Sequence, residues 1–197
     1  MAKVEPIRDL GRLNDILDAL AADNTAIGRR RYLLFASGIW LGRRVGDLLR
    51  LKVGDVKDHE ALTITEEKTG KSISLAINTR LRKIYRERLA DRDPDEWLFQ
   101  SRQRNPITGQ AKPIDKKTAY NDMKAIEKLG RFPPGYRIGT HTMRKTFGYW
   151  YYQKWHDAET LRQLFNHSSE AITRTYIGLT DDNLQDAMRR TSTMYDD

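Results

Sequence analysis

The sequence contains no cysteine, which excludes disulfide bridges, thiolate metal sites and a cysteine nucleophile. It also lacks any run of about 18 apolar residues, the length needed to cross a bilayer, and its N-terminus lacks the apolar core of a signal peptide. We therefore expect a cytoplasmic protein with no membrane partner. A chain of 197 residues is long enough to form one compact domain whose core needs no covalent cross-links.

Positive charge, in contrast, is present in excess, with a formal net charge of +8 at pH 7. This balance favours nucleic acid over acidic small molecules as the partner. Basic residues concentrate in segment 101–130, whereas acidic residues dominate 181–197, a tail that we assign to protein contacts. The residues expected to bind DNA outside the catalytic centre are Lys71, Arg102, Arg104, Lys116 and Lys117.

Apolar residues recur at helical spacing along most of the chain. An alternating pattern in 61–65 and 72–77, on either side of a turn with Gly70, predicts a β-hairpin, the only clear β element apart from a possible short strand at 96–99. Segment 101–113 is expected to be a polar surface loop. The fold class is therefore mainly α with a small antiparallel β-sheet (α+β). The predicted helices are 7–22, 29–40, 43–53, 79–89, 115–129, 141–155, 158–165, 169–177 and about 180–192.

Two pairs of polar residues are three positions apart, a spacing that places both members on one face of a helix. Asp47 is expected to hold the guanidinium of Arg44, so that the remaining N–H groups point into a cleft. His141 and Arg144 together offer two donors to an anion. Taken alone, the first pair is more often a surface ion pair, and such a histidine is as often a helix-capping or core-edge residue.

Two further patterns add a lysine and a tyrosine. Lys68 lies at the predicted hairpin turn, where it can swing toward a phosphate, although a solvated turn lysine is the commoner case. On one unbroken helix, the nine positions between His167 and Tyr176 would place them on opposite faces. The Ser-Ser pair after His167 offers an N-cap for a new helix, so that both residues can reach one site. Most tyrosines are packing residues, and the chain has nine.

Together these residues form a ring of positive groups around a phenol, with no carboxylate cluster and no metal-binding motif. Arg44 and Arg144 can bind the non-bridging oxygens of a phosphodiester and neutralise the charge that grows in the transition state. A free phenol has a pKa near ~10, so Tyr176 needs help as a nucleophile, and His141 is the best candidate. Lys68 can protonate the departing 5′ oxygen. We expect no metal, no other cofactor and no ATP, because a phosphotyrosyl ester conserves the bond energy.

These motifs, in this order, resemble the tyrosine recombinase family of phage and mobile-element integrases over roughly residues 7–190. The first family arginine is matched to Arg44, because Arg44 and not Arg43 has Asp47 at i+3. Asn166 replaces the common glycine, which Asn can do because it tolerates left-handed backbone. The resemblance implies the family's catalytic-domain fold and a set of catalytic residues, Arg44, Lys68, His141, Arg144, His167 and Tyr176, with Asp47 in support.

The resemblance also implies a 3′-phosphotyrosyl intermediate with a free 5′ hydroxyl, exchange through a Holliday junction, and a tetramer on paired sites in double-stranded DNA, formed from monomers. Most relatives carry a DNA-clamping domain before the catalytic one, but here only about two dozen residues precede the second helix. We therefore expect residues 1–197 to be a single catalytic domain without the clamp, in a truncated or naturally short form. DNA binding by this chain should then be weak and strongly salt-dependent.

Several alternatives stay open on sequence alone. The tail helix of about 180–192 can dock on a neighbouring protomer or fold back on its own core. The chain can also be a non-catalytic DNA-binding regulator on the same fold, or a monomeric topoisomerase-like enzyme that nicks and reseals one strand. A metal-dependent nuclease is a more distant alternative, which activity in EDTA would exclude.

Overall fold

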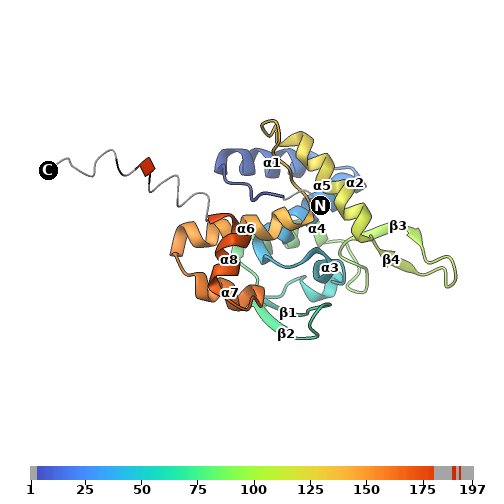
Figure 1. Ribbon diagram of the computed structural model, residues 1–197. Helices are drawn as coiled ribbons and strands as arrows, with labels where there is room; N and C mark the ends of the chain where they lie inside the picture. The colour runs from blue at the N-terminus through green and yellow to red at the C-terminus, as the bar shows by residue number, and fades with distance from the viewer. Residues whose placement is uncertain (1–3, 180–187, 190, 192–197) are drawn as a thin grey trace.

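The computed structural model describes residues 4–179, 188–189 and 191 (Figure 1). Helices form most of this part of the chain and two short hairpins complete it, which confirms the predicted fold class. The helices are α1 (Leu10–Ala22), α2 (Ala26–Leu41), α3 (Val45–Leu48), α4 (Thr79–Leu89), α5 (Lys116–Leu129), α6 (Thr140–Trp155), α7 (Ala158–Phe165) and α8 (Glu170–Ile177), with a 3-10 turn η1 (Val53–Asp55). The strands are β1 (Ala61–Thr65), β2 (Ser72–Ala76), β3 (Gln100–Arg104) and β4 (Ala111–Pro113).

Side-chain caps determine where six of these helices begin, because each cap accepts a hydrogen bond from a backbone N–H group that has no partner in the first turn. The caps are Asp9, Thr25, Asn78, Asp115, Asp157 and Ser169. Asn166 ends α7 in the left-handed conformation, with φ of 50°. The break that the sequence predicted between His167 and Tyr176 is therefore confirmed.

The main core is built around α2 and α6, which pack against each other along their length. Helix α2 is buried through almost its entire second half, and α1, α4 and α5 cover it from other sides. A second and much smaller apolar cluster consists of Leu161, Phe165, Ile177 and Leu179. It joins α7 to α8, and we call these two helices the C-terminal pair. In Figure 1 the pair lies beside α6, next to the β1–β2 hairpin.

The predicted β1–β2 hairpin is present, and its register places Leu62 opposite Leu75 and Thr65 opposite Ser72. Alternate residues of β1 are buried, as expected of a strand with one face on the core. Gly70 occupies the turn with φ of 67°, a conformation that favours glycine. This hairpin carries Lys68 toward the start of α3 and α6.

The structure differs from the expectations in three places. Helix α3 has only four residues, because Gly42 ends α2 in left-handed geometry and Arg44 is still extended, with ψ of 145°. Segment 101–113, expected to be a loop, forms most of the β3–β4 hairpin, so the prediction of one clear β element was wrong. This second hairpin is largely exposed and lacks the apolar alternation by which a half-buried strand is recognised. The expected strand at 96–99 is reduced to an isolated bridge between Trp97 and Lys52.

The helix predicted at about 180–192 lies outside the described residues, apart from 188, 189 and 191. Within the described ranges, no helix has both the length and the apolar character that crossing a membrane would require.

Candidate active site

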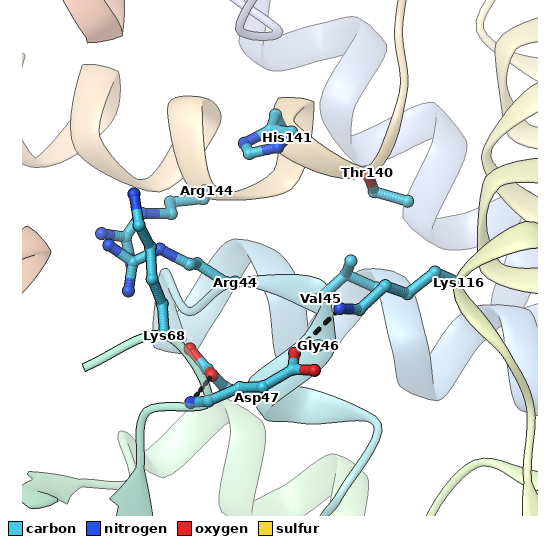
Figure 2. Close-up of a pocket in the computed structure, with 10 residues that line it drawn as sticks. Arg44, Val45, Gly46, Asp47, Lys68, Lys116, Thr140, His141 and Arg144 are labelled. Atoms are coloured by element: carbon cyan, nitrogen blue, oxygen red, sulfur yellow. Dashed lines mark hydrogen bonds and ion pairs between the residues drawn. The ribbon is translucent and has the colours of Figure 1, made fainter. Parts of the chain in front are cut away.

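A pocket of about 520 Å³ opens where the start of α3, the β1–β2 turn and the first turns of α5 and α6 meet. In Figure 2 the side chains of Arg44, Arg144 and Lys68 point toward the same part of this pocket, and Lys116 extends in from the opposite side. In the part of the chain that the structure describes, no three His, Cys, Asp or Glu side chains gather as a metal site would need. The charged and titratable residues that line the pocket are Arg44, Asp47, Glu67, Lys68, Lys116, His141 and Arg144.

Arg144 is the most firmly held of the cations in this pocket, with only 2% of its surface exposed. Its Nη1 donates to the carbonyl of Gly42 at 3.0 Å and its Nη2 to the carbonyl of Phe165 at 2.8 Å. Both carbonyls end helices, where the helix dipole favours a cation. Burial lowers the pKa of Arg144 to about 10, which still leaves it charged at neutral pH.

Arg44 faces the pocket, but its partner is not the one the sequence indicated. Its Nη1 lies 2.9 Å from Oε1 of Glu66, a charge contact without the angle of a hydrogen bond. Asp47 instead accepts a hydrogen bond at 2.9 Å from the backbone N–H of Glu67. The expected Arg44–Asp47 pairing was wrong because Arg44 precedes α3 in extended conformation, so the helical i, i+3 rule does not apply to it. Neighbouring Arg43 is buried and donates to Glu66 and to the carbonyl of Leu164.

Lys68 lies at the exposed tip of the β1–β2 turn and lines the pocket. Lys71, at the other end of the turn, is exposed and is not among the lining residues. The turn thus brings one of its two lysines to the site.

Tyr176, near the end of α8, points at the first turn of α6. Its Oη lies 3.1 Å from Nδ1 of His141. The ring of His167 lies edge-on to the Tyr176 ring, with centroids 5.2 Å apart, and its Nδ1 is 3.0 Å from Oγ1 of Thr173. The ammonium of Lys145 lies 5.3 Å from the centroid of the Tyr176 ring. The structure therefore brings the phenol into contact with both histidines, and of these three residues His141 lines the pocket.

The positive surroundings set the protonation of these groups at neutral pH. Burial raises the pKa of Tyr176, and the charges of Arg144 and Arg44 offset part of this rise. Burial lowers the pKa of His141, and nearby cations, of which Arg144 is the strongest, lower it further. Burial and the same two arginines lower the pKa of His167 to about 4. At pH 7 the phenol is therefore protonated, and the adjacent imidazole of His141 is neutral and able to accept its proton.

The remaining predicted DNA contacts are spread over two places. Lys116 lines the pocket from the first turn of α5, where its Nζ lies 2.8 Å from Oε2 of Glu67, and Lys117 is exposed beside it. Arg102 and Arg104 lie on β3 and border a separate hollow of about 300 Å³. The structure does not bring these two arginines to the site.

Glu66 is the residue of this site that the sequence reading missed. It is 3% exposed and carries a carboxylate into the middle of the arginines. A signal for it was present, because Glu66 continues the alternation of buried positions set by Leu62 and Ile64. A carboxylate at an inward position of a strand requires cationic partners.

Comparisons with known proteins agree with this geometry. Residues 10–183 match the description of the phage integrase family. The chain is also 35% identical over 186 residues to the probable integrase/recombinase YoeC of Bacillus subtilis (strain 168), covering 94% of this chain and 96% of YoeC. The chain belongs to the phage integrase family, the tyrosine recombinases.

Solved structures of recombinases share the fold of this integrase-family chain. XerA recombinase superposes with a TM-score of 0.71 at 19% identity, covering 97% of this chain and 65% of XerA. A lambda integrase dimer bound to a COC′ core site gives a TM-score of 0.65 at 19% identity, covering 91% of this chain and 50% of that protein. The integrase-family chain described here thus spans between half and two thirds of these longer proteins.

Proposed function

We propose that this protein is a site-specific DNA recombinase in which Tyr176 attacks a phosphodiester of double-stranded DNA. The observation that carries the proposal is the position of Tyr176, whose Oη lies 3.1 Å from a neutral His141 and in the electrostatic field of Arg144 and Arg44. A packing tyrosine would not need two arginines and an imidazole around its hydroxyl.

In the first step, Arg44 and Arg144 bind the non-bridging oxygens of the scissile phosphate and stabilise the added charge of the transition state. His141 accepts the phenolic proton as the bond from Tyr176 Oη to phosphorus forms. The bond from phosphorus to the 5′ oxygen breaks, and Lys68 donates a proton to that oxygen. The products are a 3′-phosphotyrosyl ester and a free 5′ hydroxyl.

His167 has a further part in binding the phosphate. When its Nδ1 accepts a hydrogen bond from the Thr173 hydroxyl, its Nε2 carries the proton and can donate to a phosphate oxygen. A neutral imidazole suits this role, since its low pKa keeps it uncharged at pH 7.

Rejoining is the reverse reaction with a different 5′ hydroxyl. Lys68 takes the proton of the incoming hydroxyl, the new bond to phosphorus forms, and His141 returns a proton to the Tyr176 oxygen as it leaves. No ATP enters, because the phosphotyrosyl ester keeps the energy of the bond that was broken. Exchange between two duplexes then passes through a Holliday junction.

The assembly belongs to the same proposal. Residues 1–197 form a single catalytic domain, monomeric without DNA, and four protomers act on paired sites in the cytoplasm. The fold supports this proposal, since it is shared with a lambda integrase tetramer bound to a Holliday junction and with XerH recombinase bound to its difH substrate.

The test uses a library of nicked duplexes with randomised positions, in which cleavage releases a short 5′ fragment and traps the covalent complex. Parent protein, Tyr176→Phe and the matched control Tyr32→Phe, a tyrosine of α2 that packs against the main core, are incubated with the library in EDTA. We expect a complex that survives denaturation with the parent and the control but not with Tyr176→Phe. Sequencing the trapped DNA gives the preferred site.

Other outcomes separate the alternative functions. A complex retained in Tyr176→Phe, or one that needs a divalent metal, would refute the proposal. Cleavage and resealing of the selected site without exchange between two duplexes would favour the topoisomerase-like alternative. Specific binding without any covalent complex would favour the non-catalytic regulator.

A further inference from the structure

The Glu66 carboxylate contacts four side chains that belong to different parts of the site. Its Oε1 pairs with Arg43 and lies 2.9 Å from Nη1 of Arg44. Its Oε2 accepts hydrogen bonds from the Thr69 hydroxyl at 2.7 Å and from the Asn166 amide at 3.4 Å. One buried carboxylate thus touches the start of α3, the β1–β2 turn and the connection between α7 and α8.

We propose that Glu66 is a positioning residue that fixes the phosphate-binding Arg44 and the turn bearing Lys68 in position relative to each other. This inference rests on the proposed function, which gives Arg44 the phosphate and Lys68 the leaving oxygen. Lys68 and Arg44 are 24 positions apart in sequence, so their relative placement depends on contacts between elements. Glu66 makes such contacts on both sides.

On the arginine side, Glu66 supplies a fixed negative charge. Burial alone would raise the pKa of Glu66, but the Thr69 hydroxyl and the charges of Arg44 and Arg43 outweigh burial and lower it. The carboxylate is therefore ionised at neutral pH and restrains Nη1 of Arg44. Because a guanidinium is planar and rigid, restraining Nη1 fixes the orientation of the whole group. Nη2 is then directed at the Phe165 carbonyl, 3.5 Å away, and the side chain lines the pocket.

On the lysine side, Glu66 closes the turn through both its backbone and its side chain. Its carbonyl accepts from the N–H of Gly70 at 2.9 Å and its N–H donates to the carbonyl of Lys71 at 2.9 Å. The Thr69 hydroxyl adds a third bond, to the carboxylate. Lys68 lies inside this bonded turn, so the position of its backbone follows Glu66.

The experiment must separate this role from that of a buried counter-ion for folding alone. It uses the duplex selected above in two forms, one with the scissile 5′ oxygen and one with sulfur in its place. A thiolate leaves without protonation, because a thiol is far more acidic than an alcohol, so the sulfur substrate does not need a general acid. Any defect that acts through Lys68 should therefore shrink on sulfur, and a defect of folding should not.

Thr69→Val tests the lysine side, with Thr65→Val as its matched control. The Thr65 hydroxyl lies 2.9 Å from the Ser72 hydroxyl across the same hairpin and does not hydrogen-bond to the Glu66 carboxylate. We expect Thr69→Val to form covalent complex about 10-fold more slowly than parent on oxygen and at the parent rate on sulfur. Lys68→Ala should show the same pattern with a larger defect, and Thr65→Val should match the parent on both substrates.

Glu66→Gln tests the arginine side, since it keeps the shape of the side chain and removes its charge. We expect a loss of about 10- to 100-fold on oxygen that sulfur reduces only in part, because Arg44 acts on oxygens that remain in both substrates. Thermal unfolding of each variant accompanies the rates. A parent-like rate for Glu66→Gln would overturn the proposal.

The remaining outcomes distinguish a failure of this inference from a failure of the proposed function on which it rests. If sulfur restores Lys68→Ala but not Thr69→Val, the role of Glu66 fails and the function stands. If Lys68→Ala is as fast as parent on oxygen, Lys68 is not the general acid, and the proposed mechanism fails together with this inference.

Discussion

The active site has two sides that are supported by different amounts of packed structure. The larger side belongs to the main core, and the smaller side is the C-terminal pair. Arg144 and His141 belong to α6, which packs along α2 in the main core, and Arg44 follows directly on α2. Tyr176 belongs to a helix of eight residues in the C-terminal pair, whose own buried cluster comprises only four apolar side chains. Apolar burial dominates the stability of packed elements, so the pair is held less strongly than the main core. The side that we propose to bind the phosphate is thus supported by more packed structure than the helix that carries the proposed nucleophile.

Besides its packing on α6, the C-terminal pair is attached to the site by polar contacts at the end of α7. Arg43 donates to the carbonyl of Leu164, Arg144 to that of Phe165, and Asn166 donates to Glu66. Three consecutive residues at the end of α7, 164–166, therefore contact polar groups on the opposite side of the site. Variants in the C-terminal pair, in the main core or at the contacts between them therefore test whether the two sides differ in stability.

The largest effect is expected for Arg144→Lys, which changes the group shared by both sides. A lysine cannot donate to two carbonyls and a phosphate in the fixed directions of a guanidinium. Covalent complex should form about 100- to 1000-fold more slowly, as on removal of one donor to a developing anion. Quenched time courses on the selected duplex measure the rate. The exposed Arg86→Lys is the control, and a loss below about 5-fold in Arg144→Lys would mean that charge alone suffices there.

A moderate effect is expected for Gly148→Ala at the face of α6 that supports the C-terminal pair. An added Cβ would lie 2.6 Å from Cγ2 of Ile177 and 2.9 Å from the ring of Phe165, so the pair must shift. We expect a destabilisation of about 1–3 kcal/mol and a slower cleavage step, with DNA affinity unchanged. Denaturant unfolding, rates and binding are measured together. Gly11→Ala on exposed α1 is the control: its added Cβ would lie 3.3 Å from Oδ1 of Asp9, so a shift of a few tenths of an ångström accommodates it and stability should change little.

A smaller effect is expected from pH, and it should arise in the C-terminal pair. Folding lowers the pKa of His167 from its usual value near ~6.5 to about 4, so between these values the unfolded chain binds a proton that the folded chain does not. Stability from this group is therefore fully present above about pH 6.5 and declines as pH falls toward 4. Denaturant unfolding from pH 7 to pH 5 should show this decline.

The control for the pH effect is His167→Asn, which removes the titrating group. Its free energy of unfolding should change less between pH 7 and pH 5 than that of the parent. The same slope in both proteins would assign the decline to other groups, of which His141, also with a lowered pKa, is the first to test.

The smallest effect is expected for Lys117→Ala, a change on the larger side. One exposed lysine at the start of α5 contributes one phosphate contact, so affinity should fall a few-fold for every DNA sequence, and the salt slope by about 1. Fluorescence anisotropy at several salt concentrations measures both quantities. Arg174→Ala, in the C-terminal pair, should leave them unchanged, and an equal loss there would show that both sides contribute to DNA affinity.

Local signals in the sequence predicted much of the fold. Helix starts such as Ser169 and the alternation in β1 depend on neighbours within a few residues, and these features are present as expected. The β3–β4 hairpin was missed because its strands are short, polar and mostly exposed. In such strands hydrogen bonding to a partner replaces the apolar pattern, and the partner is not visible locally.

In the candidate site, too, the sequence does not reveal partners that are distant along the chain. Motif order predicts its reactive residues, but their partners depend on contacts between distant residues, such as His141 and Tyr176, which are 35 positions apart. The error at Asp47 came from treating Arg44 as helical, when one extended residue redirects its side chain to Glu66. A pairing that spans two elements is decided by packing, which periodicity does not report.

The two carbonyls held by Arg144 have a consequence for when the enzyme can react. One belongs to the main core at Gly42 and the other to Phe165, the last residue of α7. If the C-terminal pair moved away, the arginine would lose one of its two anchors at the moment the tyrosine left. In the proposed mechanism, the arginine that binds the phosphate is thus fixed in part by the helix pair that carries the tyrosine, so the phosphate site is complete only when the tyrosine is in place.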